Sequence, residues 1–168
     1  SWGGRYGPNE TMPGKPYYWA NRQDTWNGAT DRDNVLRRWA VHLQNDFRAR
    51  LDWCVRDRAQ ANHPPIPHVR GALRRRVRPG SRVRLDATGS RDPDGQSLQF
   101  SWYLYPEAGI YRGPEPVLEG GATPTAALTI PEGNHGGNIH VILAVTDTGE
   151  PALTRYRRVI LTLPDARG

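Results

Sequence analysis

The stretch DATGSRDPDGQSLQFSWYLY, residues 86–105, joins an acidic loop to a run in which every second residue is apolar. Leu98, Phe100, Trp102 and Leu104 alternate with Gln, Ser and Tyr. A period of two is typical of a strand with one buried face, because successive side chains of a strand point to opposite faces. The stretch therefore predicts that the acidic loop leads into a β-strand and that Trp102 lies in the core.

The same period recurs along the second half of the chain. It appears in PHVRG (67–71), RVRLDA (82–87), PVLEG (116–120), TAALTI (125–130), NIHVILAVTD (138–147) and RYRRVILTL (155–163). Together these make about seven short strands separated by Gly, Pro and Asn turns, the rhythm of an immunoglobulin-like sandwich. Cys54 is the only cysteine, so hydrophobic burial must hold the sheets together without a disulfide. We expect a mainly β fold, with an antiparallel β-sandwich over residues 66–168.

Residues 34–62 have a different period. Apolar residues recur three or four positions apart, at Leu36, Trp39, Leu43, Phe47, Leu51 and Cys54. This spacing places them on one stripe of a helix that is expected to pack, with Trp39 and Trp53 in that packing. We expect one helix of up to about 28 residues, begun by Asp31 or Asp33 and ended by the proline-rich NHPPIP.

Residues 1–32 show neither period and are rich in Gly, Pro, Asn and aromatic residues. We expect irregular coil there, with turns at Gly3-Gly4, Gly7-Pro8 and Asn27-Gly28. The aromatic content is too high for an ordinary disordered tail, so this coil must pack against something. The predicted domains are residues 1–65, an aromatic coil and long helix that act as a docking segment, and residues 66–168, the sandwich.

The net charge of +6 comes almost entirely from arginine, since all but one of the 23 basic residues are Arg. The densest cluster, residues 69–84, could neutralise phosphates, but the solvated face of a strand is favoured over nucleic-acid binding. No apolar run approaches the roughly 20 residues that cross a bilayer, so no membrane partner is expected. The chain opens at Ser1 without a signal-peptide pattern, and we expect a processed or excised piece of a longer protein.

The acidic loop raises the question of a metal site. A calcium loop of the EF-hand type needs oxygen ligands at three alternate positions and a distal Glu, and this loop lacks the third position and the Glu. A calcium site of another geometry, built from Asp86, Asp92 and Asp94 with Asp147, is the lesser alternative. Asx-type turns closed by Gly95 are favoured, and no cofactor is otherwise expected.

Exposed Trp and Tyr rings can stack on the apolar faces of sugar rings, while polar side chains bond the sugar hydroxyls. The carbohydrate-binding candidates are Tyr17, Tyr18, Trp19, Asp24 and Trp26 in the coil, and Tyr103, Tyr105, Glu107 and Tyr111 around the Trp102 strand. For each aromatic residue taken singly, packing is favoured over binding. No catalytic residue is assigned, because a general acid/base pair of Glu107 with Asp24 or Glu115 requires the fold to bring them together in a cleft.

Several segments resemble known families. Residues 77–105 resemble the first half of a PKD-type domain. WGGRYG (2–7), RRWAVHLQNDFRARLDWCVRD (37–57) and WYLYPEAGIYRG (102–113) resemble, in that order, the C-terminal part of bacterial nucleoside-hydrolase-related proteins often labelled cellulose-binding protein. In that family a nucleoside-hydrolase-like α/β domain precedes an Ig-like sandwich. The aspartate cluster with which nucleoside hydrolases bind calcium and activate water has no counterpart in this sequence.

The resemblance implies a non-catalytic accessory module of an exported protein, extracellular or periplasmic. Its expected partners are a cellulose-type polysaccharide, the upstream nucleoside-hydrolase-like domain, or both. The alternative is that the N-terminal coil completes the active site of a glycoside or nucleoside hydrolase, with Asp24, Glu107 or both as the acids.

Overall fold

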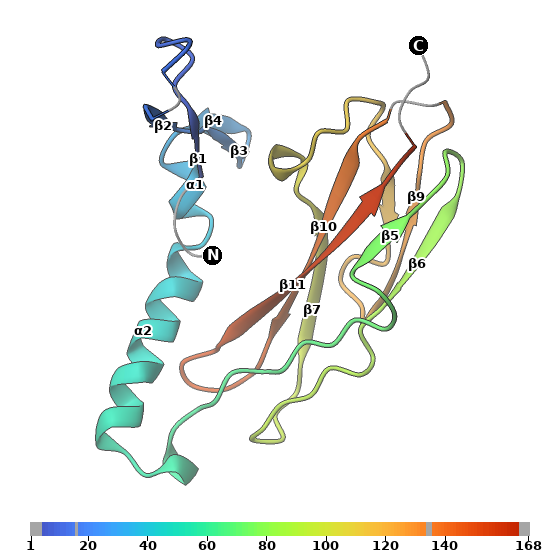
Figure 1. Cartoon of the computed structure of the whole chain (residues 1–168). Coiled ribbons are helices and arrows are strands. Elements are labelled where there is room, and N and C mark those ends of the chain that lie inside the picture. Colours follow the sequence, from blue (N-terminus) through green and yellow to red (C-terminus); the bar gives the residue numbers. More distant parts are fainter. Residues whose placement is uncertain (1–4, 16, 134–135, 165–168) are drawn as a thin grey trace. The chain divides into compact units, whose positions relative to one another are not determined.

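The computed structural model describes residues 5–15, 17–133 and 136–164 (Figure 1). The chain divides into two compact units, residues 1–48 and 49–168. This division falls inside a helix, whereas the sequence predicted a boundary between residues 65 and 66. Residues 49–65 group with the second unit. The assignment of 1–65 and 66–168 as folding domains stays a prediction.

The second unit contains the predicted β-sandwich. One sheet has four strands in the order β5-β11-β10-β7, and the other has three in the order β6-β9-β8. The strands are β5 (Arg74–Arg76), β6 (Arg82–Asp86), β7 (Gln99–Leu104), β8 (Val117–Glu119), β9 (Thr125–Thr129), β10 (Asn138–Thr146) and β11 (Thr154–Thr162). All pairs are antiparallel except β5 with β11. The mainly β, Ig-like fold class is therefore confirmed.

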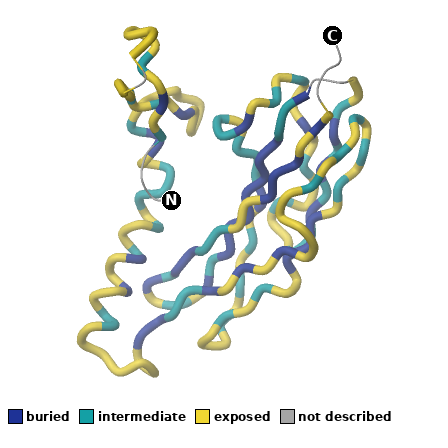
Figure 2. The backbone as a smooth tube through the Cα atoms, in the orientation of Figure 1, coloured by how far each residue is buried: buried dark blue, intermediate teal, exposed yellow. Residues whose placement is uncertain are grey.

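The core lies between the two sheets and follows the predicted alternation. Ile139, Val141, Leu143 and Val145 of β10 all belong to it, as does Trp102 of β7. The facing sheet contributes Leu85, Ala126 and Leu128. Figure 2 shows the buried residues concentrated along the long strands of the sandwich. Trp102 is thus the core tryptophan that the sequence predicted.

One predicted strand is displaced. The strand expected at residues 67–71 forms instead at β5, where Arg74 pairs with Ile160 of β11. The earlier residues make only an isolated bridge, Ile66 to Arg91, and a hydrogen bond from the Arg70 N–H to the Asp86 carbonyl. Prolines at 64, 65 and 67 explain the difference, because proline has no N–H to donate to a ladder.

The predicted single helix is wrong in two respects. It is interrupted between α1 (Asn34–Arg37) and α2 (Ala40–Val55), where the Trp39 N–H donates to the Leu36 carbonyl. A short 3-10 helix, η1 (Arg58–Gln60), follows α2. Most of its predicted apolar stripe is also exposed rather than packed, and only Trp39 of that stripe is half-buried. No helix in the described part of the chain is both long enough and apolar enough to span a membrane.

The first unit contains two short hairpins where coil was predicted. β1 (Tyr6–Pro8) pairs with β2 (Trp19–Asn21), and β3 (Asp24–Trp26) pairs with β4 (Ala29–Asp31). The β3–β4 turn is the predicted Asn27-Gly28, with φ values of 51° and 76°. Positive φ at both positions is the requirement of a type I′ hairpin turn, which Asn-Gly meets at low cost. The predicted turn at Gly7-Pro8 is wrong, because both residues lie in β1. Residues 1–4 and 16 of the predicted coil, with the predicted turn at Gly3-Gly4, lie outside the described residues.

We expect the sandwich core to dominate stability. Replacing Ile130, which is 1% exposed, with Ala should lower the free energy of unfolding by about 2–5 kcal/mol, because it removes buried methylenes and leaves a cavity. Ile110→Ala, at a residue that is 65% exposed, should stay within about 0.5 kcal/mol of the parent chain. Urea denaturation followed by tryptophan fluorescence measures both, and equal effects would contradict the core assignment.

Candidate functional site

The β1–β2 ribbon has one exposed aromatic face and one face that carries only the small residues Gly7 and Ala20. Cross-strand partners place their side chains on the same face, so Tyr6 and its partner Asn21 share a face with Pro8 and its partner Trp19. All four are exposed, with Tyr6 at 62% and Trp19 at 61%, while Gly7 on the opposite face is buried. We call this surface, made of Tyr6, Pro8, Trp19 and Asn21, the aromatic face.

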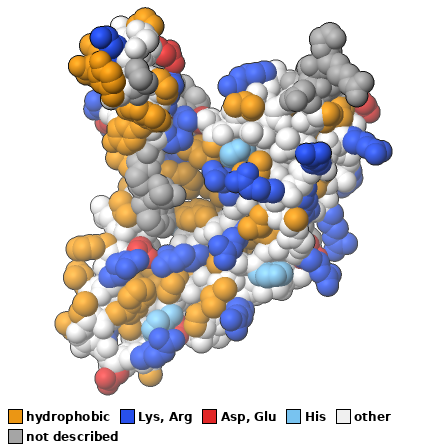
Figure 3. Space-filling view, in the orientation of Figure 1, with side chains coloured by type: hydrophobic (Ala, Val, Ile, Leu, Met, Phe, Trp, Pro, Cys, Tyr) orange, Lys and Arg blue, Asp and Glu red, His pale blue; other side chains and the backbone are white. Residues whose placement is uncertain are grey.

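Two further aromatic residues precede Trp19 directly. Tyr17 is 69% exposed and Tyr18 is 47% exposed, and their ring centroids lie 5.0 Å apart with the planes tilted by 46°. The Tyr18 backbone is held at the ribbon, because its carbonyl accepts the Asn9 N–H at 2.9 Å. Figure 3 shows hydrophobic side chains gathered at this end of the first unit. Three of the predicted coil candidates, Tyr17, Tyr18 and Trp19, are therefore presented to solvent next to one another in the chain.

Asp24 does not take part in that surface. Its carboxylate is completely buried and forms ion pairs with Arg5, which precedes β1, and with Arg38, at 3.5 Å, between α1 and α2. The Arg5 Nε–H donates to Oδ1 at 2.8 Å, and the Asn34 amide donates to the Asp24 carbonyl at 3.1 Å. The prediction that Asp24 bonds sugar hydroxyls is wrong for this geometry, because a buried, ion-paired carboxylate is closed to a polymeric ligand.

Trp26 lies apart from the aromatic face in the strand pairing. It is the last residue of β3 and pairs with Ala29. Its exposed fraction of 37% is the lowest of the four aromatic candidates in the predicted coil. The ribbon itself is tied by the Arg22 N–H, which donates to the Arg5 carbonyl, and by the Arg22 guanidinium, which pairs with Glu10 and lies against Gly7. A side chain at Gly7 would meet that guanidinium, so the Arg22 side chain would have to move to admit it.

The second group of candidates surrounds the end of β7. Tyr103 pairs with Ile142 in the ladder, and the Tyr105 N–H donates to the His140 carbonyl at 2.9 Å. Glu107 lies in the short 3-10 helix η2 (Pro106–Ala108). All four candidates are partly buried, and Tyr111 packs against the core, where burial raises the pKa of its phenol.

The same region holds a cavity of about 290 Å³. Its lining includes Leu104, Tyr111, Glu115 and the start of β10. Of the predicted residues here only Tyr111 lines it, so the aromatic residues of this group do not form an exposed platform. Their role in binding stays a prediction.

The acidic loop forms turns. Asp86 Oδ1 accepts the Thr88 N–H at 3.0 Å and its hydroxyl at 2.7 Å, and these bonds lower the pKa of the Asp86 carboxyl. Asp92 Oδ1 accepts the Asp94 N–H at 2.8 Å and the Gln96 N–H at 3.2 Å, and Gly95 has a φ of 76°. Among the described residues no group of three or more His, Cys, Asp or Glu could hold a metal ion. The favoured Asx-type turns are present, and a calcium role for these aspartates stays a prediction.

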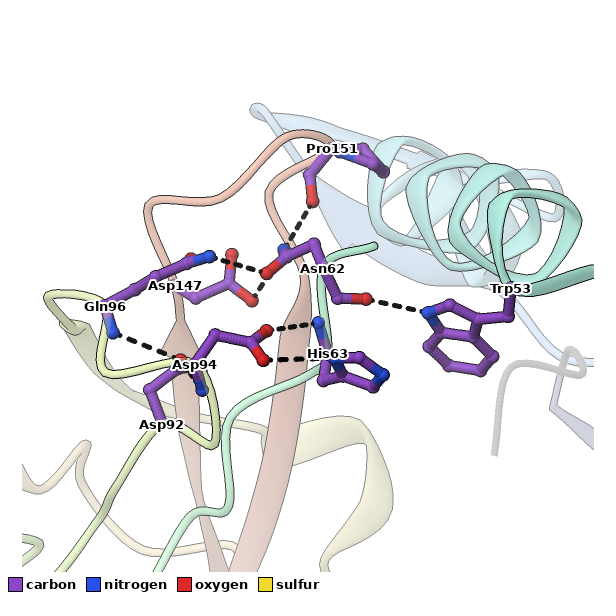
Figure 4. Close-up of polar contacts among 8 residues, drawn as sticks. All are labelled: Trp53, Asn62, His63, Asp92, Asp94, Gln96, Asp147 and Pro151. Atoms are coloured by element: carbon purple, nitrogen blue, oxygen red, sulfur yellow. Dashed lines mark hydrogen bonds and ion pairs between the residues drawn. The ribbon is translucent and has the colours of Figure 1, made fainter. Parts of the chain in front are cut away.

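Asp94 belongs to a polar network that joins three segments of the second unit (Figure 4). Its carboxylate accepts the His63 backbone N–H at 2.7 Å and lies 3.1 Å from His63 Nδ1. The neighbouring Asn62 amide donates to the buried Asp147 carboxylate at 3.1 Å and to the Pro151 carbonyl at 2.9 Å. Asn62 also accepts from the Gln96 amide at 2.8 Å, and its carbonyl accepts the indole N–H of Trp53 at 2.8 Å.

Two important residues were missed by sequence reasoning. Tyr6 was not a candidate, because its place opposite Asn21 depends on a strand pair that three-residue segments do not reveal. Asn62 was treated only as part of the helix stop. Its distant partner, Asp147, is 85 positions away in the chain, and no local pattern signals such a contact.

The arrangement in the first unit can stack flat apolar surfaces and bond hydroxyl groups. Trp and Tyr rings offer apolar faces with a polar edge, and Asn21 offers both a donor and an acceptor beside them. The ribbon beneath them is tied to the β3–β4 hairpin by the ion pair of Arg5 with Asp24. These features match an extended ligand with apolar ring faces better than they match a small molecule in a closed pocket.

Comparison with known proteins finds a matching family model and similar solved structures. Residues 82–163 match the family model described as "Cellulose-binding protein Sde0182, C-terminal domain". Among solved structures, the chain is similar to a nucleoside hydrolase-related hypothetical protein from Saccharophagus degradans that is associated with carbohydrate metabolism, with 34% identity and a TM-score of 0.74. That match covers 93% of this chain and 38% of the other, so the chain spans 38% of the length of that protein.

A second similar structure is the PKD domain of the KIAA 1837 protein, at 18% identity and a TM-score of 0.40, covering 60% of this chain and 88% of that one. No curated protein matches the chain. The two sheets and the core tryptophan behind an acidic turn define an Ig- and PKD-like β-sandwich. Residues 82–163 are similar to this family of C-terminal domains of cellulose-binding proteins, represented by Sde0182. The family resemblance seen in the sequence is therefore confirmed.

The Asn62 network gives a stability prediction. Asn62→Ala should lower the free energy of unfolding by about 3 kcal/mol, because it leaves buried acceptors at Asp147 and Pro151 without their amide donor. Gln96→Ala, which removes a single bond to Asn62, should cost about 1 kcal/mol. Urea denaturation measures both losses of stability. An Asn62 variant as stable as the parent chain would show that the network does not stabilise the fold.

His140 gives a pH prediction. Burial, together with Arg158 and Arg74, lowers the pKa of this imidazole below its usual 6.5, so the unfolded chain binds more protons in acid. Stability should therefore fall as pH drops through 6.5, and His140→Gln should flatten that dependence. His42, whose pKa burial also lowers, accounts for a remaining slope.

Thermal melts between about pH 7.5 and 5.5 measure this dependence. His68→Gln, at an exposed histidine, is the matched control and should keep the parent slope. A His140 variant with an unchanged slope would show that this imidazole is not kept neutral by the fold.

Proposed function

We propose that this chain is a non-catalytic accessory module that binds a cellulose-type polysaccharide through the aromatic face of the β1–β2 ribbon. The observation that carries the proposal is the exposure of Tyr6 and Trp19 on one face of a rigidly held ribbon. The name of the matching family, a cellulose-binding protein, supports a glycan as the ligand. The association of the S. degradans relative with carbohydrate metabolism supports the same class.

The physics of glycan binding fits this face. A β-linked glucan is a flat ribbon whose ring faces are apolar and whose edges carry hydroxyl groups. Trp19 and Tyr6 can stack on the ring faces, and Asn21 can exchange hydrogen bonds with the edge. Tyr17 and Tyr18 extend the exposed aromatic surface along the chain.

A non-catalytic role is favoured over a completed hydrolase site. The alternative needs Asp24 as an acid open to substrate, but its carboxylate is buried in ion pairs with Arg5 and Arg38. Glu107 belongs to the other unit, in η2, and does not line the cavity of that region. Both observations support an accessory module rather than an acid pair acting on a glycosidic bond.

We further propose the setting in which the module acts. In a longer protein it associates with an upstream nucleoside-hydrolase-like domain, in keeping with the 38% of the S. degradans relative that it covers. The proposed location is extracellular or periplasmic, where a protein meets polysaccharide. No nucleic-acid partner is proposed, because the groove that Arg82 and Arg84 of β6 line also carries Glu119 and has no aromatic residue on which a base could stack.

The aromatic face can be tested by removing one ring. Trp19→Ala should weaken retention on microcrystalline cellulose, or in affinity gels containing soluble glucans, at least about tenfold, because it removes the largest stacking surface. Trp26→Ala is the matched control, since it removes the same side chain from the other hairpin and should leave binding within about twofold.

The outcomes separate the possibilities. Parent binding that is lost in the Trp19 variant alone supports the aromatic face. A parent chain that none of the cellulose, xylan or mixed-linkage glucan samples retains would contradict glycan binding. Release of reducing sugar or nucleobase by the chain alone, abolished by Glu107→Gln, would overturn the non-catalytic assignment.

A further inference from the structure

Helix α2 exposes the face that its sequence marks as apolar. The exposed residues recur three or four positions apart, and we call them the α2 stripe: Leu43, Phe47, Leu51 and Cys54. Phe47 is 64% exposed, and the helix is continuous from Ala40 to Val55, so these side chains form one row. The opposite face, which carries Ala49 and the acidic Asp46, is buried instead.

This arrangement reverses the usual orientation of an amphipathic helix. A helix of a soluble protein normally turns its apolar stripe to the core and its charged residues to water. Here the tube of α2 is coloured as exposed over much of its length, and hydrophobic side chains lie along its surface (Figures 2 and 3). An exposed row of large apolar side chains marks an interaction surface, since its burial by a partner is favourable.

A second copy of this chain is a poor occupant for the α2 stripe. The stripe is bordered by arginines, with Arg50 on one side and Arg48 on the other, and the chain carries a net charge of +6. Two copies packed stripe to stripe would bring these like charges together across the interface, which opposes association. The surface therefore suits a partner with an apolar groove and an acidic rim.

The comparison with the S. degradans protein indicates which partner that is. The chain aligns over 93% of its own length and accounts for only 38% of that protein. A relative with this fold thus carries a large further region in the same polypeptide. A region in the same polypeptide is present at a high effective concentration, so a modest apolar contact is enough to hold it.

We infer that the α2 stripe is the docking surface for the nucleoside-hydrolase-related region of a longer family protein, with Phe47 as its central anchor. This inference rests on the proposed association with that domain and adds the surface that makes it. Phe47 lies in the middle of the row, and large rings buried at the centre of an interface contribute most to binding.

The test uses the region of the S. degradans protein that this chain does not cover, produced as a separate chain, as the probe. Calorimetric titration of the 168-residue chain with this probe measures the affinity. Phe47→Asp should weaken binding at least about tenfold, because it places a charge in the apolar contact. Val41→Asp is the matched control, since Val41 is 69% exposed on the same helix outside the stripe, and binding should stay within about twofold.

A second readout uses the thiol of Cys54, the only cysteine of the chain. Its rate of alkylation should fall severalfold when the probe is bound, and the fall should disappear in the Phe47 variant. Circular dichroism of each variant shows that α2 is retained.

Each result bears on a different statement. Equal loss of affinity in the Phe47 and Val41 variants, or none in either, would overturn the stripe as the docking surface while leaving the association intact. A probe that does not bind the parent chain would overturn both. Sedimentation that shows the chain dimerising through Phe47 would assign the stripe to a second copy. Cellulose retention, measured separately, decides the glycan proposal independently of these outcomes.

Discussion

The side-chain amide of Asn62 is the contact on which the arrangement of the second unit's loops depends. Asp147 is a buried carboxylate whose Oδ1 accepts the N–H groups of Gly149 and Leu153, and Asn62 supplies the donor to Oδ2. A buried carboxylate without such donors is strongly destabilising, so the β10–β11 turn and the Asn62 segment require each other. Gly149 lies directly against the Asn62 amide, and no side chain would fit there.

The same contact explains what the acidic motif does. The Asn62 side chain contacts the β6–β7 loop by accepting a hydrogen bond from Gln96. The next residue of the chain, His63, donates its backbone N–H to Asp94 of the same loop. The carboxylates of the loop therefore bond N–H groups of the protein, in the way that a metal-binding loop would bond a cation. The chain leaving α2 is fixed to the sandwich by this network, and the Trp53 indole bonded to the Asn62 carbonyl brings the last turn of the helix into it.

The predictability of this fold follows the range of the interactions involved. The period of two in β10 and the Asn27-Gly28 turn are local signals, and both appear in the structure as expected. The burial of Asp24 depends on contacts between distant residues, because its partners Arg5 and Arg38 lie 19 positions before it and 14 positions after it. Arg38 is also the point at which the helix is interrupted between α1 and α2. The same limit applies to the site: the exposed aromatic residues are recognisable by type, but Tyr6 joins Trp19 only through the pairing of β1 with β2.

The two proposed surfaces share a physical origin. The sandwich buries its own apolar residues, because the inward-facing side chains of its two sheets pack against each other. The family model matches this part of the chain. Residues 5–55 contain two hairpins, each made of two three-residue strands, and a helix whose stripe is exposed. The described residues of the first unit include few large apolar side chains that are buried. A segment that orders itself mainly through ion pairs, such as those of Asp24, leaves its aromatic and aliphatic side chains available. Tyr6 and Trp19 on the ribbon, and Phe47 on the helix, are therefore the side chains through which ligands and partners gain the most apolar contact.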